Sequence, residues 1–302
     1  MPIVTVNEVP LNVLDQGHGT PLLLVHGFPV DHTMWQRQMD DLAQEYRVIA
    51  PDLRGFGRSP ATSGEVLMEQ FADDLAVLLD VLGVAEPVVF CGLSMGGYIA
   101  WQFWRRHRAR LAALVLCDTR ALADPPEVAQ GRLATAARVL AEGVSLLPET
   151  MLQRLFAPVT FDEQPELIAV TRRVMLNTPA AGAAAALRGM AQRPNFTSQL
   201  GAIDVPTLAL CGEQDAIATV SEMRALAAGI AGAQFLEIPH AGHMAPLENP
   251  APVNAAIRVL LAAQRPAGGR SQVGPGVGQV RHDAANPTRF GESSANGRRP
   301  LT

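Results

Sequence analysis

Six apolar stretches, each ending at a turn, constrain the fold of this chain more than any other feature. They read "PLLLVHG", "YRVIAPDLRG", "EPVVFCG", "LAALVLCD", "VPTLALCGEQD" and "AQFLEIPHAGH". Continuous apolar runs of this length are typical of strands that helices bury on both faces. Helical patterns separate them, at 34–45, 69–82, 97–106, 220–228 and 252–263. Strands that alternate with helices predict a three-layer α/β fold with a mostly parallel sheet.

One long interval breaks the alternation. Residues 120–202 contain no convincing strand and are rich in Ala, Leu, Met and Arg, which predicts several amphipathic helices. An insertion of this size between two strands is expected to cap the carboxyl edge of the sheet. The predicted organisation is therefore a core of 1–119 and 203–264, a helical cap of 120–202, and a tail of 265–302. The tail is rich in Gly, Pro, Arg and Ser, so we expect it to be disordered.

The composition excludes several classes of function. The 302 residues are 48% hydrophobic and carry a net charge of −5, so no basic excess attracts nucleic acid. No apolar stretch approaches the roughly 20 residues of a membrane span, and no signal peptide is visible. We therefore expect a cytoplasmic protein without nucleic-acid or membrane partners. The residues indicate no oligomeric state. Cys91, Cys117 and Cys211 make no disulfide framework, and we interpret them as small buried hydrophobic residues.

The stretch "VVFCGLSMGGYIAWQF" places a serine at the point where a strand turns directly into a helical pattern. Such a turn crowds the residue at its tip, and Gly92 and Gly96 relieve the crowding. The strain costs roughly 1–3 kcal/mol and leaves Ser94 exposed at the edge of the sheet, next to a helix N-terminus. This is the position of a nucleophile.

A serine hydroxyl needs a base within hydrogen-bond reach and a third group that orients the base. The stretch "EIPHAGHMAPLENP" supplies His243 and His240. We prefer His243, because Gly242 lets its loop approach Ser94. For the acid, Asp215 follows one buried run and Asp118 follows the preceding one. We prefer Asp215, with Asp118 as the alternative.

The transition state of acyl transfer also needs two donors for its oxyanion. One is expected to be the N–H of Met95, the residue after the nucleophile. The other is expected to be the N–H of Phe28, in the turn that His26 and Gly27 open. We interpret His26 as a structural residue that braces this loop, and Asp52 as a turn former.

Five motifs together resemble the α/β-hydrolase superfamily: "LLLVHGFP", "YRVIAPDLRGFGRS", "GLSMGGYIA", "CGEQDAI" and "PHAGHMAPLENP". The resemblance extends from about residue 21 to residue 263. Within the superfamily the chain is similar to small bacterial carboxylesterases and to 3-oxoadipate enol-lactonases, which share the Gly-Leu-Ser-Met-Gly-Gly type of turn. The resemblance implies a triad of Ser94, Asp215 and His243, with Phe28 and Met95 as oxyanion donors.

We therefore expect a serine hydrolase that cleaves small carboxylic esters or lactones through an acyl-enzyme. The chemistry needs no cofactor and no metal, and the expected partner is a small-molecule ester or lactone. The alternatives are a cofactor-free perhydrolase or haloperoxidase-type activity with the same triad, a peptidase, and a non-catalytic ligand-binding protein of this fold. Epoxide hydrolases and dehalogenases usually carry aspartate where this chain has Ser94. The residues expected to line the pocket are Met34, Met151, Phe156, Met190 and Met244.

Overall fold

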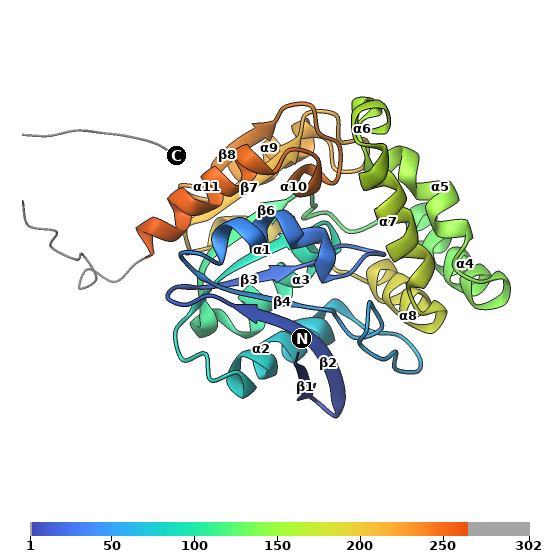
Figure 1. Ribbon diagram of the computed structural model, residues 1–302, viewed down its shortest axis with the longest axis horizontal. Helices are drawn as coiled ribbons and strands as arrows, with labels where there is room; N and C mark the ends of the chain where they lie inside the picture. The colour runs from blue at the N-terminus through green and yellow to red at the C-terminus, as the bar shows by residue number, and fades with distance from the viewer. Residues whose placement is uncertain (1, 265–302) are drawn as a thin grey trace, which may run out of the picture. The chain divides into compact units, whose positions relative to one another are not determined.

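The computed structural model describes residues 2–264 and contains one eight-stranded sheet (Figure 1). Along the sheet the strands follow the order β1-β2-β4-β3-β5-β6-β7-β8. The first three are antiparallel neighbours, and every pair from β4 onward is parallel. The strands are β1 Ile3–Val6, β2 Val9–Gln16, β3 Pro21–Val25, β4 Arg47–Pro51, β5 Val88–Leu93, β6 Leu111–Cys117, β7 Thr207–Gly212 and β8 Gln234–Ile238.

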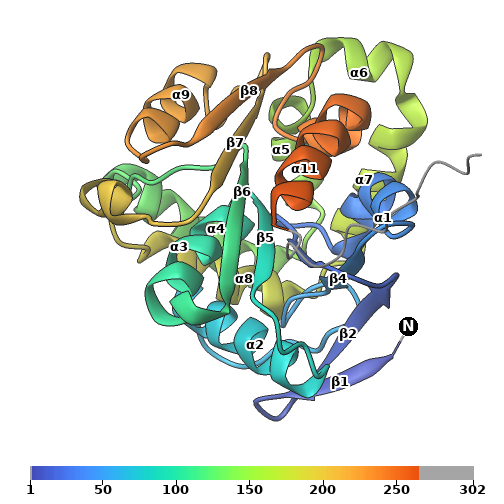
Figure 2. The ribbon, with the colours of Figure 1, turned by 90° about the vertical axis from the view of Figure 1, so that its left-hand side faces the viewer.

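Helices cover both faces of the sheet, which confirms the predicted three-layer α/β fold (Figure 2). On one face α1 packs against α11, and on the other α2 packs against α3, with α9 beside β7 and β8. Strands β3, β5 and β6 are buried along nearly their whole length because they lie between these layers, as their continuous apolar sequences predict. The helices are α1 Gln36–Leu42, α2 Met68–Val81, α3 Met95–Arg106, α9 Val220–Ala228, α10 Ala245–Glu248 and α11 Pro250–Ala263.

The first predicted helix, 34–45, divides into two elements in the structure. A 3-10 turn, η1 His32–Trp35, precedes α1, and the Asp31 side chain caps it by accepting a hydrogen bond from the N–H of Thr33. The other helical predictions agree with the structure to within two residues at each end. Strands β1 and β2 form an antiparallel hairpin with a tight turn. Only Asn7 and Glu8 lie in it, both with positive φ, and β2 begins at once.

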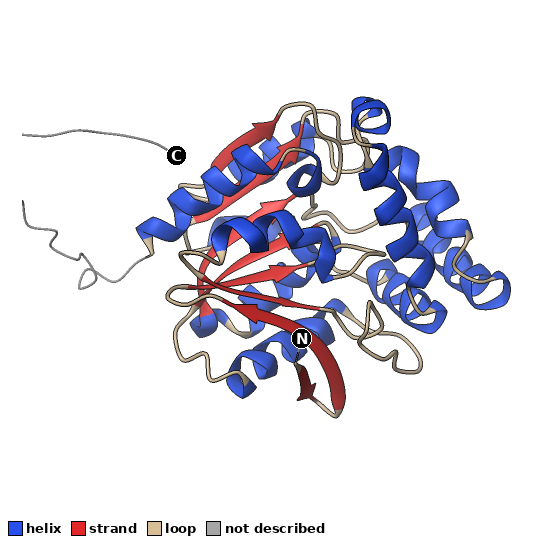
Figure 3. Cartoon of the chain, viewed as in Figure 1, coloured by secondary structure: helices blue, strands red, loops and turns tan. Residues whose placement is uncertain are grey.

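The chain between β6 and β7 forms helices and no strand, and these helices lie beyond the carboxyl ends of the parallel strands (Figure 3). Residues 2–264, this helical cap included, belong to one compact unit. The predicted tail, 265–302, lies outside the described residues. The elements of the cap are α4 Pro126–Glu142, α5 Leu146–Leu155, α6 Pro158–Glu163, α7 Pro165–Asn177, α8 Ala180–Ala191 and the 3-10 turn η3 Thr197–Ala202.

Candidate active site

Ser94 occupies a strained position between β5 and α3. Its backbone angles are φ 54° and ψ −109°, which L-residues rarely adopt. Strain of this kind costs about 1–3 kcal/mol and persists where the surrounding structure imposes it. The surroundings here are a buried strand before the serine and a buried helix after it. The hydroxyl is thereby held at the carboxyl edge of the sheet.

Two glycines make this sharp turn sterically possible. A Cβ atom on Gly96 would lie 2.3 Å from the carbonyl oxygen of Val25 on the neighbouring strand β3. A Cβ atom on Gly92 would lie 2.4 Å from the carbonyl oxygen of Gly96 itself. Real Cβ atoms do not approach backbone oxygens so closely. The two glycines flanking Ser94 therefore let the helix start directly against the sheet, as the sequence predicted.

His243 and Asp215 lie side by side at the same edge of the sheet. Asp215 follows β7 and His243 follows β8, and both side chains are almost completely buried. The Nδ1 atom of His243 donates to Oδ2 of Asp215 at 2.8 Å. The other carboxylate oxygen, Oδ1, accepts the N–H groups of Ile217 at 2.7 Å and Ala218 at 3.0 Å. Three donors thus fix the carboxylate, which in turn fixes the imidazole.

The two alternatives considered from the sequence lie in different surroundings. His240 is exposed, and its backbone N–H donates to the Glu213 carboxylate. Asp118 is fully buried; Oδ1 accepts the N–H of Gly212, and Oδ2 has no hydrogen-bond partner among the described residues. Burial, with Asp215 nearby, raises the pKa of the Asp118 carboxyl well above its ordinary value. The neutral form of Asp118 is therefore favoured beside Asp215.

The backbone N–H groups of Phe28 and Met95 have no hydrogen-bond partner within residues 2–264. Met95 is the first residue of α3, where the first N–H groups of a helix remain free. Phe28 follows His26, whose ring is fixed from both sides: Nδ1 donates to the Gly27 carbonyl, and Nε2 accepts the N–H of Leu53. The bracing of this loop by His26 agrees with the sequence interpretation.

Ser94 and His243 both line a cavity of about 460 Å³ between the sheet edge and the cap. The hydroxyl of Ser94 makes no hydrogen bond to any of the residues described, so its contact with His243 stays a prediction. Of the expected pocket residues, Met151 and Met190 line this cavity, together with Phe28. Leu147, Leu155 and Leu187 add to its apolar wall.

Three of the expected pocket residues do not line this cavity. Met34 faces a separate small hollow against Val174, because η1 turns its side chain toward α7. Phe156 and Met244 are buried in the packing behind the cavity wall. An apolar side chain suits a core position as well as a position in a pocket wall, so the sequence does not distinguish the two.

The sequence reasoning missed a polar wall in the same cavity. Asp124 and Arg132 line it, and Oδ2 of Asp124 contacts both Arg132 and the buried Arg193 at 2.6 Å. Arg120 pairs with Glu222, and Arg154 has no ion-pair partner in the described part of the chain. A helical stripe carries part of this wall: Leu147, Thr150, Met151 and Arg154 repeat at the three- and four-residue spacing of one face of α5. That spacing was the available signal.

In the described part of the chain, two clusters have the composition of metal sites. One contains Asp31, His32 and Asp52, and the other contains Asp118, Cys211 and Asp215. In the first, Asp52 accepts hydrogen bonds from both the ring and the N–H of His32, as well as from Asn12. Hydrogen bonding within the protein therefore accounts for this cluster and for the turn-forming role expected of Asp52.

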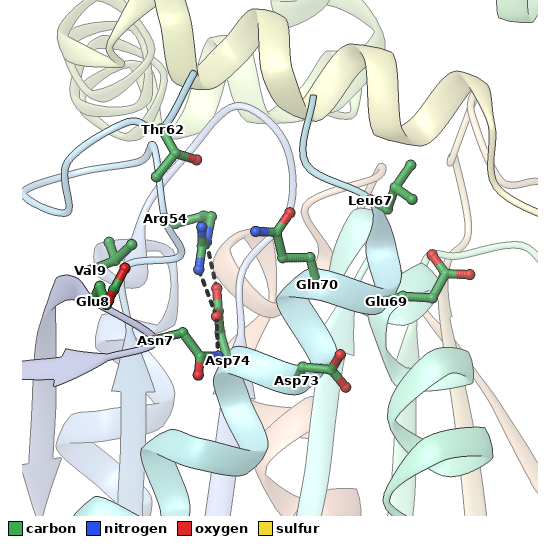
Figure 4. A pocket seen from close by; sticks show the side chains of 10 residues that line it. All are labelled: Asn7, Glu8, Val9, Arg54, Thr62, Leu67, Glu69, Gln70, Asp73 and Asp74. Carbon is green, nitrogen blue, oxygen red and sulfur yellow. Dashed lines mark hydrogen bonds and ion pairs between the residues drawn. The ribbon is translucent and has the colours of Figure 1, made fainter. Parts of the chain in front are cut away.

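A larger hollow, of about 650 Å³, lies between the β1–β2 hairpin and the start of α2 (Figure 4). Arg54 donates to both oxygens of Asp74, at 2.6 and 2.7 Å, and Asn7 donates to the same carboxylate. The lining residues include three more carboxylates and no serine or histidine. Despite its size this hollow holds no nucleophile paired with a base, so the smaller cavity at Ser94 is the candidate active site.

Comparisons with known proteins identify the fold that carries this site. The model of the alpha/beta hydrolase fold matches residues 20–250. A 3-oxoadipate enol-lactonase of Acinetobacter baylyi is 27% identical over 260 residues, which cover 85% of this chain and 95% of the relative. Among solved structures, a thermophilic esterase from Thermogutta terrifontis has a TM-score of 0.85 and 47% identity, covering 87% of this chain and 98% of that one.

The enol-lactonase from Burkholderia xenovorans has a TM-score of 0.81 and 30% identity, covering 86% of this chain and all of that one. Within the described residues no helix is long and apolar enough to cross a bilayer. Residues 20–250, which the family model matches, contain the strained serine, the buried acid–histidine pair and strands β3 to β8 of the sheet. The chain belongs to the α/β-hydrolase family.

Proposed function

We propose that this chain hydrolyses small carboxylic esters or lactones, with Ser94 as nucleophile, His243 as base and Asp215 as the orienting acid. The observation that carries the proposal is the 2.8 Å hydrogen bond between Asp215 and His243, whose ring shares a cavity with Ser94. The esterase and enol-lactonase relatives support the same bond type. Metal ions play no part in the proposed steps.

The steps follow from the positions of these groups. The Oγ atom of Ser94 attacks the ester carbonyl, and Nε2 of His243 takes its proton. The oxyanion accepts hydrogen bonds from the N–H groups of Phe28 and Met95, which have no other partner in the described chain. The proton then passes from His243 to the leaving alcohol. Water repeats the sequence on the acyl-enzyme and releases the acid.

The cavity wall favours substrates that carry an anionic group away from the scissile bond. Arg154 lines the cavity without a carboxylate partner among residues 2–264, and Asp124 neutralises only one of its two arginines. A carboxylate on the substrate would complete this charge balance. The 3-oxoadipate enol-lactonase relative is named for such an acid-bearing lactone.

The test is a matched series of p-nitrophenyl esters, one neutral and one ending in a carboxylate at equal chain length. We expect hydrolysis of both, and loss of several orders of magnitude in kcat for Ser94→Ala. Near wild-type turnover by Ser94→Ala would refute the nucleophile. Arg154→Gln should lower kcat/KM about three- to tenfold for the anionic ester alone, because Arg154 is exposed and its charge is screened. Arg173→Gln, on the outside of α7, is the control.

A further inference from the structure

Glu248 is a buried carboxylate that the steps above do not use. It ends the short helix α10, directly after the loop that carries His243, and is only 5% exposed. Four groups donate hydrogen bonds to its two oxygens, at 2.6 to 3.2 Å. A carboxylate with this many partners holds several backbone segments at once, so the identity of these partners decides what it does.

The first oxygen of Glu248 binds the two neighbours of the base. Oε1 accepts the N–H of Gly242 at 2.8 Å and the N–H of Met244 at 3.2 Å. These residues flank His243 in the chain, so Oε1 fixes the peptide groups on both sides of the imidazole-bearing residue. The Asp215 hydrogen bond orients the ring, and Glu248 fixes the backbone from which that ring projects.

The second oxygen binds the cap. Oε2 accepts the N–H of Ala157 at 2.8 Å and the hydroxyl of Thr160 at 2.6 Å, at the start of α6. The N–H of Met244 is also shared with the carbonyl of Leu155, at 3.1 Å. A Cβ atom on Gly242 would lie 2.6 Å from the Ala157 nitrogen, so the two backbones are in direct contact.

The cap segment held by Glu248 is continuous with the cavity wall. Leu155 ends α5, whose residues Met151 and Arg154 line the cavity at Ser94. A movement of α5 toward or away from a bound substrate would therefore displace the peptide groups that Glu248 binds. One carboxylate thus binds both the segment that follows α5 and the loop that carries His243.

We propose that Glu248 is a positioning residue that holds His243 at its working distance from Ser94 and links this position to the cap. The inference rests on the proposed hydrolase function. Three backbone N–H groups and one hydroxyl donate to the two oxygens, an arrangement that favours the ionised carboxylate. Burial raises the pKa of the Glu248 carboxyl, and the donated hydrogen bonds oppose that rise.

Glu248→Gln keeps the shape of the side chain and removes one of its two accepting oxygens. Its NH₂ group must face either the His243 loop or the cap, and the donors on that side lose their acceptor. We expect kcat to fall about 10- to 100-fold with KM changed less than about threefold, since a misplacement of about 1 Å costs this much. Glu163→Gln, the same exchange at an exposed position of α6, is the matched control and should behave as the wild type.

A second readout does not depend on turnover. The proton between His243 and Asp215 should give a downfield ¹H NMR signal in the resting full-length protein. We expect this signal to be sharp in the wild type and in Glu163→Gln, and broadened or absent in Glu248→Gln. A purely structural role would lower Tm and leave both kcat and the signal unchanged, so a folded Glu248→Gln with wild-type values would overturn the proposal.

Thr160→Val tests the cap side alone and removes a single hydrogen bond. It should lower kcat about two- to fivefold and broaden the same signal. If Glu248→Gln does not fold, this variant decides: wild-type kcat together with a sharp signal refutes the link between cap and base. If the wild type hydrolyses no ester, the proposed function fails, while the NMR comparison still tests the positioning of His243.

Discussion

Exchanging Asp215 for Asn alters one side-chain atom, and the structure predicts which way the new amide will face. Oδ1 of Asp215 accepts two backbone N–H groups, from Ile217 and Ala218. An amide NH₂ at that position would leave both buried donors unsatisfied, at about 1–3 kcal/mol each. The amide oxygen therefore stays there, and the NH₂ group faces His243.

The consequence falls on the tautomer of His243. An NH₂ group facing Nδ1 requires that atom to accept a hydrogen bond, so the ring proton moves to Nε2. A protonated Nε2 cannot take the proton of Ser94, and the charge that stabilises the imidazolium is also gone. The same exchange in a serine protease lowers kcat by about 10⁴. We expect a loss of about 10²–10⁴ here, which corresponds to about 2.7–5.4 kcal/mol on the barrier.

The assay is the steady-state hydrolysis of a p-nitrophenyl ester at neutral pH, with Asp118→Asn as the matched variant. Burial raises the pKa of Asp118 and favours its neutral form, which Asn resembles in both shape and charge. We expect less than about a tenfold change in kcat for it. If Asp118→Asn loses activity and Asp215→Asn keeps it, the acid is misassigned and this reasoning about tautomers is wrong.

Two further predictions concern stability. Because the pKa of Asp118 is raised in the folded state, the unfolded chain loses its proton first, and wild-type stability should fall as pH rises above about 4, by at most about 1.4 kcal/mol per pH unit. Asp118→Asn removes this slope, so the difference in unfolding free energy between the variant and the wild type, measured with denaturant, should increase in favour of the variant as pH rises. A difference that does not depend on pH would contradict the raised pKa. Ser94→Gly relieves the strain at φ 54° and should raise the unfolding free energy by about 1 kcal/mol while abolishing activity; an unchanged or lower Tm would show that the turn is not strained.

The sequence was most informative where backbone geometry alone selects the residue. Gly92 and Gly96 are required because a Cβ atom at either position would lie 2.3–2.4 Å from a backbone oxygen. A strand–serine–helix turn therefore leaves little choice of residue. The sheet was equally predictable, because strands buried on both faces need continuous apolar sequences. Both rules are local, so they do not depend on how the cap helices pack.

The pocket was less predictable because it depends on how each helix is rotated. Met151 and Met190 point into the cavity, whereas Met34 and Met244 pack elsewhere, although all four are methionines near the sheet edge. The type of a residue does not indicate how its helix is rotated about the helix axis. The three- and four-residue spacing that places Arg154 beside Met151 does carry it, but only once α5 is known to lie over the site.

The choice between Asp118 and Asp215 shows why the sequence leaves two acids open. Both follow buried strands at the same sheet edge, so position cannot separate them. Their hydrogen-bond donors separate them. Asp215 accepts three hydrogen bonds, one of them from His243, whereas within residues 2–264 the Asp118 carboxyl accepts only the N–H of Gly212. Two buried carboxyl groups this close cannot both be ionised without a large cost, so the negative charge stays where donors are most numerous. The neutral form of Asp118 is therefore favoured, and this geometry supports Asp215 as the acid that orients His243.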